Sequence, residues 1–146
     1  MLIFRRKERG LEVFLVHPGG PFWAKKDLGA WSIPKGEYTG EEDPLAAARR
    51  EFEEETGARV EGEFVELGTI RQAGGKLVTA WACKGDLDPA RLVSNFVEME
   101  WPPRSGRMVK FPEVDRGAWF GVDEAAERIL ASQRELLERL EGKVGG

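Results

Sequence analysis

Cysteine, histidine and tyrosine each occur only once in the 146 residues, as Cys83, His17 and Tyr38. A single cysteine cannot form a disulfide within the chain, which fits a reducing compartment such as the cytoplasm. A single histidine excludes zinc sites that need several histidine ligands. No G-x-S-x-G motif is present to supply a nucleophilic serine. We therefore interpret His17 as a loop or strand-end residue, with a catalytic role as the alternative.

Long apolar runs and a strong net charge are also missing. No segment approaches the roughly 20 apolar residues of a membrane span, and residues 1–4 are too short an apolar run for a signal peptide. The net charge is −4 at pH 7, which does not favour general binding to nucleic acid. These absences predict a cytoplasmic protein with neither a membrane nor a nucleic-acid duplex as partner.

Length and composition predict one domain over residues 1–146, with an ordinary apolar core. Apolar periodicity predicts strands at residues 2–5, 11–17, 31–33, 60–72, 76–83 and 95–101. A C-terminal helix is expected over residues 123–141, capped by Asp123, with Ile129, Leu130 and Gln133 on the stripe that recurs at helical spacing. This mixture of elements indicates an α+β fold.

The helix predicted between residues 43 and 57 has clear ends and an unusual charge. Asp43 suits the N-cap, Pro44 the first helical position, and Gly57 the left-handed residue after the last turn. The last turns nevertheless carry glutamates at positions 51, 53, 54 and 55. Carboxylates at a helix C-terminus are each disfavoured by roughly 0.3–1 kcal/mol. Local helix stability therefore does not explain them.

Glu51, Glu54 and Glu55 share one face of this helix, because they are three and four residues apart. Like charges this close repel one another unless a cation lies between them. Oxygen ligands favour a hard cation such as Mg²⁺ or Mn²⁺. The pattern predicts a metal site, and an ordinary solvated acidic face is the alternative.

Residues 36–58 resemble the signature box of the Nudix hydrolases, G-x5-E-x7-R-E-U-x-E-E-x-G-U, where U is apolar. The matching residues are Gly36, Glu42, Arg50, Glu51, Phe52, Glu54, Glu55, Gly57 and Ala58. The resemblance implies an α/β/α sandwich with a mixed β-sheet between helices. It also implies metal-dependent hydrolysis of a phosphoanhydride bond in a nucleoside diphosphate linked to another group, with two or three Mg²⁺ or Mn²⁺ ions.

Residue roles follow from the same resemblance. It implies metal ligands at Glu51, Glu54 and Glu55 and at a backbone carbonyl of Lys35 or Gly36. Pro112 and Glu113, six residues before Trp119, match a segment that supplies a distal ligand in many family members, so Glu113 is expected to bind metal. Glu98 and Glu100 are the alternatives. Arg50 can pair with Glu51 or Glu54, and Glu42 is expected to brace the loop; Glu51, Glu55 or a loop glutamate could serve as the general base.

Basic and aromatic residues near these positions are candidates for substrate binding. They are Lys35, Arg71, Lys76, Trp81, Arg104 and Arg107. The cations could contact phosphate oxygens and Trp81 could stack on a base. The alternatives are solvated loop charges for the cations, core packing for Trp81, and a surface or dimer loop for the segment around Arg104.

The preferred substrate is a dinucleoside or nucleoside polyphosphate, because Pro34-Lys35-Gly36 resembles the entry to the box in dinucleoside-polyphosphate hydrolases. The tyrosine common after the box in those enzymes is missing, and so is the proline of many ADP-ribose enzymes. Pyrophosphohydrolysis of nucleoside triphosphates, oxidised ones included, as in MutT-type enzymes is the first alternative. A non-catalytic nucleotide-sensing module is the second. The chain is expected to be a monomer or a homodimer.

Overall fold

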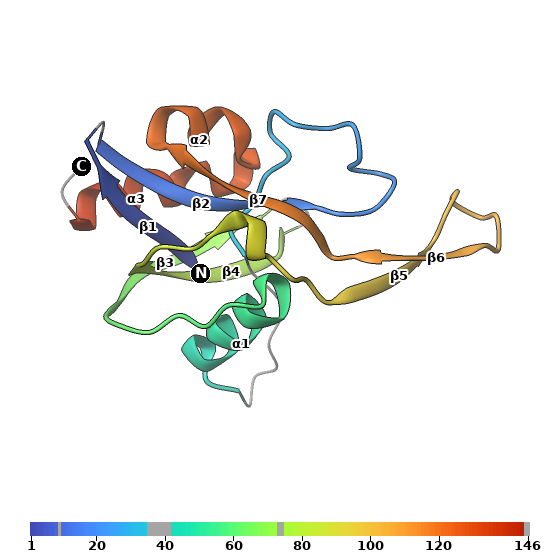
Figure 1. Cartoon of the computed structure of the whole chain (residues 1–146), viewed down its shortest axis with the longest axis horizontal. Helices are drawn as coiled ribbons and strands as arrows, with labels where there is room; N and C mark the ends of the chain where they lie inside the picture. Colours follow the sequence, from blue (N-terminus) through green and yellow to red (C-terminus); the bar gives the residue numbers. More distant parts are fainter. Residues whose placement is uncertain (9, 35–41, 73–74, 145–146) are drawn as a thin grey trace.

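The computed structural model describes residues 1–8, 10–34, 42–72 and 75–144. Their main feature is a five-stranded mixed sheet in the order β3-β4-β1-β2-β7 (Figure 1). The strands are β1 Leu2–Lys7, β2 Gly10–Pro18, β3 Phe64–Arg71, β4 Leu77–Lys84 and β7 Val114–Gly121. β1 pairs with β4 in parallel, and the other neighbours pair in antiparallel fashion. The strands predicted at residues 2–5 and 11–17 are therefore present, each slightly longer than expected.

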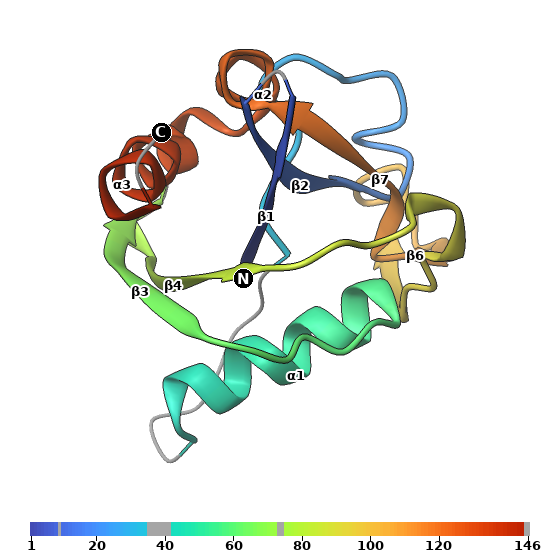
Figure 2. The same ribbon diagram turned by 60° about the vertical axis from the view of Figure 1, so that its left-hand side comes forward.

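Helices cover both faces of this sheet (Figure 2). They are α1 Pro44–Thr56 on one face, and α2 Val122–Arg128 and α3 Arg134–Val144 on the other. Alternate side chains of β1 enter two different apolar clusters: Leu2 and Phe4 pack in the cluster with α2 and α3, whereas Ile3 packs in the cluster with α1. The expected α/β/α sandwich is confirmed.

Helix α1 begins and ends where its sequence predicts. The Asp43 carboxylate accepts a hydrogen bond from the Ala46 N–H, and Gly57 has φ 76° while its N–H donates to the Glu53 carbonyl. Phe52 is fully buried against the sheet. These contacts fix both the length of α1 and the face that it turns to the core.

The expected C-terminal helix over residues 123–141 is wrong. The chain leaves α2 after Arg128, and Ile129 is extended, with ψ 152°. Main-chain hydrogen bonds explain this break, because the Leu130 N–H donates to the Trp31 carbonyl and the Trp31 N–H donates to the Arg128 carbonyl. A 3₁₀ turn, η3 Ala131–Gln133, then leads into α3. Gly121, not Asp123, is the N-cap of α2.

Two strand predictions also need correction. β3 begins at Phe64 rather than residue 60, and its pairing with β4 shifts register between Glu66 and Gly68. Residues 31–33 make only isolated bridges, through Trp31 and Ser32, rather than a strand.

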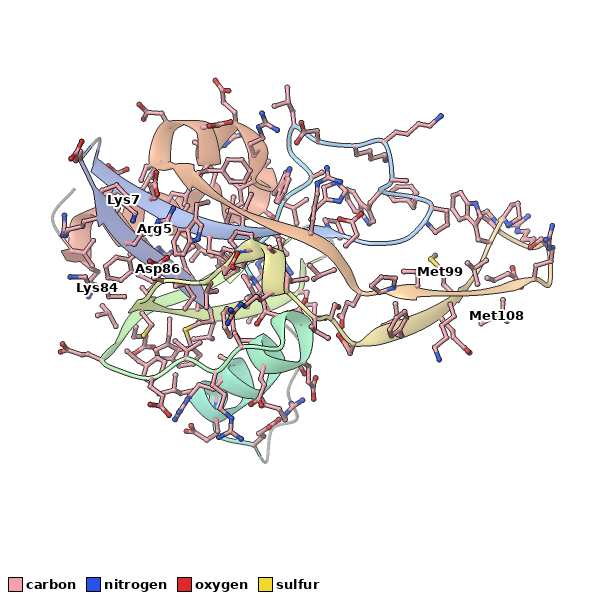
Figure 3. All side chains as sticks on the ribbon, in the orientation of Figure 1. Arg5, Lys7, Lys84, Asp86, Met99 and Met108 are labelled. Carbon is pink, nitrogen blue, oxygen red and sulfur yellow. The ribbon has the colours of Figure 1, made fainter. Side chains whose placement is uncertain are left out.

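Strands β5 Phe96–Glu100 and β6 Met108–Pro112 form a separate two-stranded sheet, called the arm below. The arm extends from the sandwich past the end of α1 (Figure 1). Met99 and Met108 mark its outer half in Figure 3, and Phe96 is 60% exposed. In the described part of the chain, no helix is long and apolar enough to cross a membrane.

Candidate active site

The three box glutamates lie on the last turns of α1 in different surroundings. The side chain of Glu54 is 43% exposed and that of Glu51 is 14% exposed. Glu55 is buried, with 5% of its surface exposed. The helical spacing thus places one carboxylate at the surface, one at the boundary and one inside.

Arg50 links these carboxylates to the loop before the helix. Its Nε and Nη2 donate to the two carboxylate oxygens of Glu42, at 2.9 and 2.8 Å. Its Nη1 donates to Glu51 at 2.9 Å and to Glu54 at 3.2 Å. The hydrogen bonds from Arg50 lower the pKa of Glu42, so this carboxylate stays ionised. Arg50 therefore pairs with both candidate glutamates, and Glu42 holds its guanidinium in place; a catalytic role for Arg50 stays a prediction.

Glu51 carries the clearest sign of crowded negative charge. Burial raises its pKa first, and the charge of Glu54 raises it further. The hydrogen bond and charge of Arg50 act in the opposite direction, and the charge of Glu113 adds to the rise. Glu113 is therefore close enough to act on the box helix, although it lies between β6 and β7.

A short main-chain clamp holds Glu113 beside α1. The Asn95 N–H donates to the Glu54 carbonyl at 2.8 Å, and the Asn95 carbonyl accepts from the Glu113 N–H at 2.9 Å. On its other side, the Glu113 carbonyl accepts from the Gly19 N–H at 2.9 Å. A Cβ at Gly19 would lie 2.0 Å from the Pro112 carbonyl oxygen, so only glycine allows this approach.

The alternative distal ligands, Glu98 and Glu100, lie on β5 of the arm. Glu98 lies opposite Lys110 in the register of β5 and β6, and Glu100 accepts a hydrogen bond from the Arg104 N–H. Of the three candidates, Glu113 is the one whose charge acts on Glu51. The structure thus brings Glu113, rather than Glu98 or Glu100, to the box glutamates.

The donor set suits a hard divalent cation, because it consists of carboxylate oxygens whose mutual repulsion a cation would relieve. Glu51, Glu54, Glu55 and Glu113 could hold such an ion. Within the described ranges, no three histidine, cysteine, aspartate or glutamate side chains already form a metal cage. Among the described residues, Arg50 is a cation that pairs with Glu51 and Glu54. The predicted carbonyl ligands at Lys35 and Gly36 lie outside the described residues.

A cavity of about 240 Å³ adjoins the carboxylates, with Glu55 and Glu113 in its wall. Most of its lining is apolar, from Val16, Pro18, Trp23, Ala30, Val114 and Leu130. Ser32 also lines it, but its hydroxyl already donates to the Ile33 carbonyl and accepts from Gln133. The site therefore combines an acidic wall with an apolar hollow.

The other predicted substrate contacts are spread over two places. Arg71 donates to the Gly75 carbonyl and closes the β3–β4 hairpin, and Lys76 lies in the same turn. Trp81 is half-buried and packs in the apolar cluster beneath α1. Arg104 and Arg107 lie in the turn between β5 and β6, at the end of the arm. Lys35 lies outside the described residues, and all these binding roles stay predictions.

Two buried polar side chains hold the frame of this site. His17 is fully buried on β2; its Nε2 lies 2.6 Å from the Lys26 carbonyl and its Nδ1 lies 3.0 Å from Asp115. This supports the interpretation of His17 as a strand-end residue. Gln133, which sequence periodicity assigned to an apolar stripe, is fully buried and bonds Ile33, Ser32 and Gln72.

Sequence reasoning missed Trp23, Asn95 and the anchoring role of Gln133. Asn95 acts through its main chain, so its side chain gives no signal. Trp23 follows Pro21 and Phe22 in a glycine- and proline-rich loop. Two adjacent aromatic residues in such a loop are the sequence signal that could have indicated a binding role.

Comparisons with known proteins agree with the fold. Solved structures with similar folds include an Ap4A hydrolase of C. elegans in a binary complex (20% identity, 99% of this chain and 96% of that one, TM-score 0.66). The NUDIX domain of Shewanella oneidensis NrtR, complexed with ADP ribose, matches over 98% of this chain and 84% of that one (18% identity, TM-score 0.63). A mutT/nudix family protein from Listeria innocua matches over 99% and 90% (20% identity, TM-score 0.62).

No curated protein sequence matches the chain. The model of the NUDIX domain family does match, over residues 1–140. This match spans the box, the five-stranded sheet, α1, α2 and the first part of α3. The chain belongs to the Nudix hydrolase family.

Proposed function

We propose that this protein hydrolyses a phosphoanhydride bond of a nucleoside or dinucleoside polyphosphate in the presence of Mg²⁺ or Mn²⁺. The observation that carries the proposal is the crowding of carboxylates at the end of α1. Glu51, whose side chain is only 14% exposed, carries a raised pKa beside Glu54 and Glu113, although Arg50 donates to it. This excess negative charge is suited to cation binding and costs stability otherwise.

The glutamates and Arg50 have different roles in the proposed hydrolysis. Glu51, Glu54, Glu55 and Glu113 present oxygens to the cation. A divalent ion bound there would neutralise phosphate charge and lower the pKa of a water molecule. Arg50 orients Glu51 and Glu54, because its guanidinium is itself fixed by two hydrogen bonds to Glu42. Glu51 and Glu55 are both candidates for the base that accepts the proton of the attacking water.

Two features support a nucleotide substrate. The cavity beside Glu55 and Glu113 offers apolar surface next to the acidic wall, which suits a ligand with a flat apolar part and an anionic part. Structures of similar fold also include an Ap4A hydrolase and a domain complexed with ADP ribose. A nucleoside triphosphate pyrophosphohydrolase of the MutT type is the alternative within the same chemistry.

The proposal is tested by a hydrolysis screen with Mg²⁺, Mn²⁺ or a chelator. Substrates are nucleoside triphosphates, dinucleoside polyphosphates, ADP-ribose and nucleotide sugars, with products resolved by chromatography. We expect turnover of one class, lost with the chelator and at least 100-fold slower in Glu54→Gln, because one ligand and one charge are removed.

Glu53→Gln is the matched control. Glu53 is exposed, adjacent to Glu54 in sequence, and pairs with Arg59 rather than with Arg50. It should keep wild-type turnover. No turnover of any substrate by the wild type, with nucleotide binding intact, would favour the non-catalytic nucleotide-sensing module. An equal loss of turnover in Glu54→Gln and Glu53→Gln would show that turnover depends on the total negative charge of α1 rather than on the position of Glu54.

A further inference from the structure

The cavity beside Glu55 and Glu113 has Trp23 among its lining residues. Trp23 is half-buried, in the loop that joins β2 to the bridge at Trp31. The opposite parts of the lining come from the sheet, through Val16 and Val114, and from Leu130 after α2. Trp23 is the one aromatic side chain among the lining residues that the structure describes.

The loop is held firmly enough to fix the position of this indole. At its start, Gly19 bonds the Glu113 carbonyl. Further along, the Lys26 N–H donates to the Trp23 carbonyl at 2.9 Å, and the Lys26 carbonyl lies 2.6 Å from the buried His17 ring. At its end, Asp27 accepts from the Trp31 indole at 2.7 Å. A wall fixed before the ligand arrives needs little ordering on binding.

Neighbouring side chains support the indole from outside the cavity. The Phe22 ring meets it edge to face, with centroids 5.0 Å apart and planes at 85°. The Lys26 ammonium lies 3.7 Å from the Phe22 centroid and 5.2 Å from the Trp23 centroid. These contacts hold Trp23 at the edge of a site whose other wall is acidic.

The size and lining of the cavity limit what it can hold. At about 240 Å³ it lies just below the roughly 300–1,000 Å³ typical of sites for whole drug-sized ligands. It suits a single flat ring system better than a complete nucleotide. Its apolar lining disfavours phosphate, which would instead lie towards the carboxylates and their cation.

We propose that this cavity is the subsite for the aromatic base of the substrate and that Trp23 is its stacking wall. The inference rests on the proposed function, because it assumes that the polyphosphate lies at Glu51, Glu54, Glu55 and Glu113. Stacking between a base and an aromatic side chain changes affinity by about 5- to 150-fold on truncation. The ligand class is thus a nucleotide whose base stacks through its flat face.

The test compares Trp23→Leu with Trp23→Phe. Both substitutions keep an apolar side chain in the wall, but only phenylalanine keeps an aromatic face. KM is measured for the nucleotide that the wild type turns over, and the inhibition constant is measured for inorganic triphosphate, which has no base. We expect Trp23→Leu to raise KM about 10- to 100-fold and Trp23→Phe to raise it only a few-fold, with the inhibition constant for triphosphate unchanged in both.

Leu28→Ala is the control, because it truncates an apolar side chain of the same loop that is 70% exposed and does not line the cavity. It should change KM less than threefold. An unchanged KM in Trp23→Leu would overturn the inference, and so would a parallel rise in the inhibition constant for triphosphate. Melting temperatures are recorded for all three variants. If Trp23→Leu does not fold, the KM and the inhibition constant of Trp23→Phe still test the inference.

A binding experiment separates this inference from the proposed function. Adenosine, guanosine, cytidine and uridine are titrated by calorimetry without metal ions into the wild type and Trp23→Leu. Binding of at least one nucleoside, weakened in the variant, supports the inference even if the wild type hydrolyses nothing. Hydrolysis of nucleotides by the wild type with no dependence of KM on Trp23 would retain the proposed function and overturn the inference alone.

Discussion

Replacing Gln133 by leucine should destabilise the protein strongly, although the two side chains are similar in size. Gln133 is fully buried in η3. Its Oε1 accepts from the Ile33 N–H, and its Nε2 donates to Ser32 Oγ and to Gln72 Oε1, each at 3.0 Å. Gln133 therefore ties Ser32 and Ile33, in the segment before the box, to Gln72, the residue after β3, and to η3.

The expected loss can be worked out from these bonds. Each hydrogen bond contributes about 0.5–1.5 kcal/mol net, and a buried donor left without an acceptor costs about 1–3 kcal/mol. Ile33 is buried, so its N–H would become such a donor. Allowing for the apolar contacts that leucine gains, we expect a decrease of about 3 kcal/mol in the free energy of unfolding. For a chain of this length that corresponds to a melting temperature lower by about 6–12 °C.

Thermal unfolding followed by circular dichroism measures this difference. Ser132→Ala, one residue away in the same 3₁₀ turn, is the control and should stay within about 2 °C of the wild type. A Gln133→Leu variant that melts equally close to the wild type would refute the reasoning. It would mean that the three hydrogen bonds contribute no net stability.

Three further predictions concern the core and two titratable groups. Phe52→Ala, which empties a fully buried site under α1, should lower the free energy of unfolding by about 3–5 kcal/mol in urea, and Phe52→Leu by clearly less. The pKa of Asp27 lies below its ordinary 3.8, chiefly because of hydrogen bonds from Trp31 and then Arg128. The ionised carboxylate therefore stabilises the folded protein fully above pH 3.8, and this stabilisation is lost as the pH falls through the lower pKa of the folded state. The melting temperatures of wild type and Asp27→Asn should differ at pH 6 and converge in acid. Burial raises the pKa of the Cys83 thiol, so iodoacetamide at pH 8 should label it slowly in the native protein and rapidly in urea, as mass spectrometry would show.

The box helix was predictable because its signals are local. Asp43 and Gly57 act on backbone groups within a few residues, so sequence alone fixes both ends. The face shared by Glu51 and Glu54 follows from helical geometry in the same way. Their pairing with Arg50 needed only the spacing of positions on α1.

The break between α2 and α3 was not predictable in this way. Periodicity continues through Ile129 and Leu130, and neither residue is a helix breaker. The helix stops because the main chain there pairs with Trp31, which is remote in sequence. A tertiary partner thus overrides local propensity, and it also turns Gln133 from a member of an apolar stripe into a buried hydrogen-bonding anchor.

The arm shows that nearness in sequence to Glu113 is not nearness in space for Arg104 and Arg107. Arg107 precedes Glu113 by six positions, and β6 occupies most of that interval. An extended strand rises about 3.3 Å per residue, so six residues span about 20 Å. Most of a strand therefore separates the tip of the arm from Glu113, and the binding roles of Arg104 and Arg107 stay predictions. Trp23 illustrates the opposite case, because the fold brings it to the cavity wall with Glu113, far along the chain.

The end of α1 shows how the fold tolerates glutamates where a helix favours cations. The last turn carries no basic residue. Instead, the N–H groups of Val93 and Asn95 donate to the Thr56 and Glu54 carbonyls, and the Gly57 N–H donates to Glu53. These donors satisfy carbonyls that create the negative end of the helix dipole. Because main-chain donors from a distant segment stabilise the helix end, its side chains remain available for cation binding, and the same segment positions Glu113 opposite them.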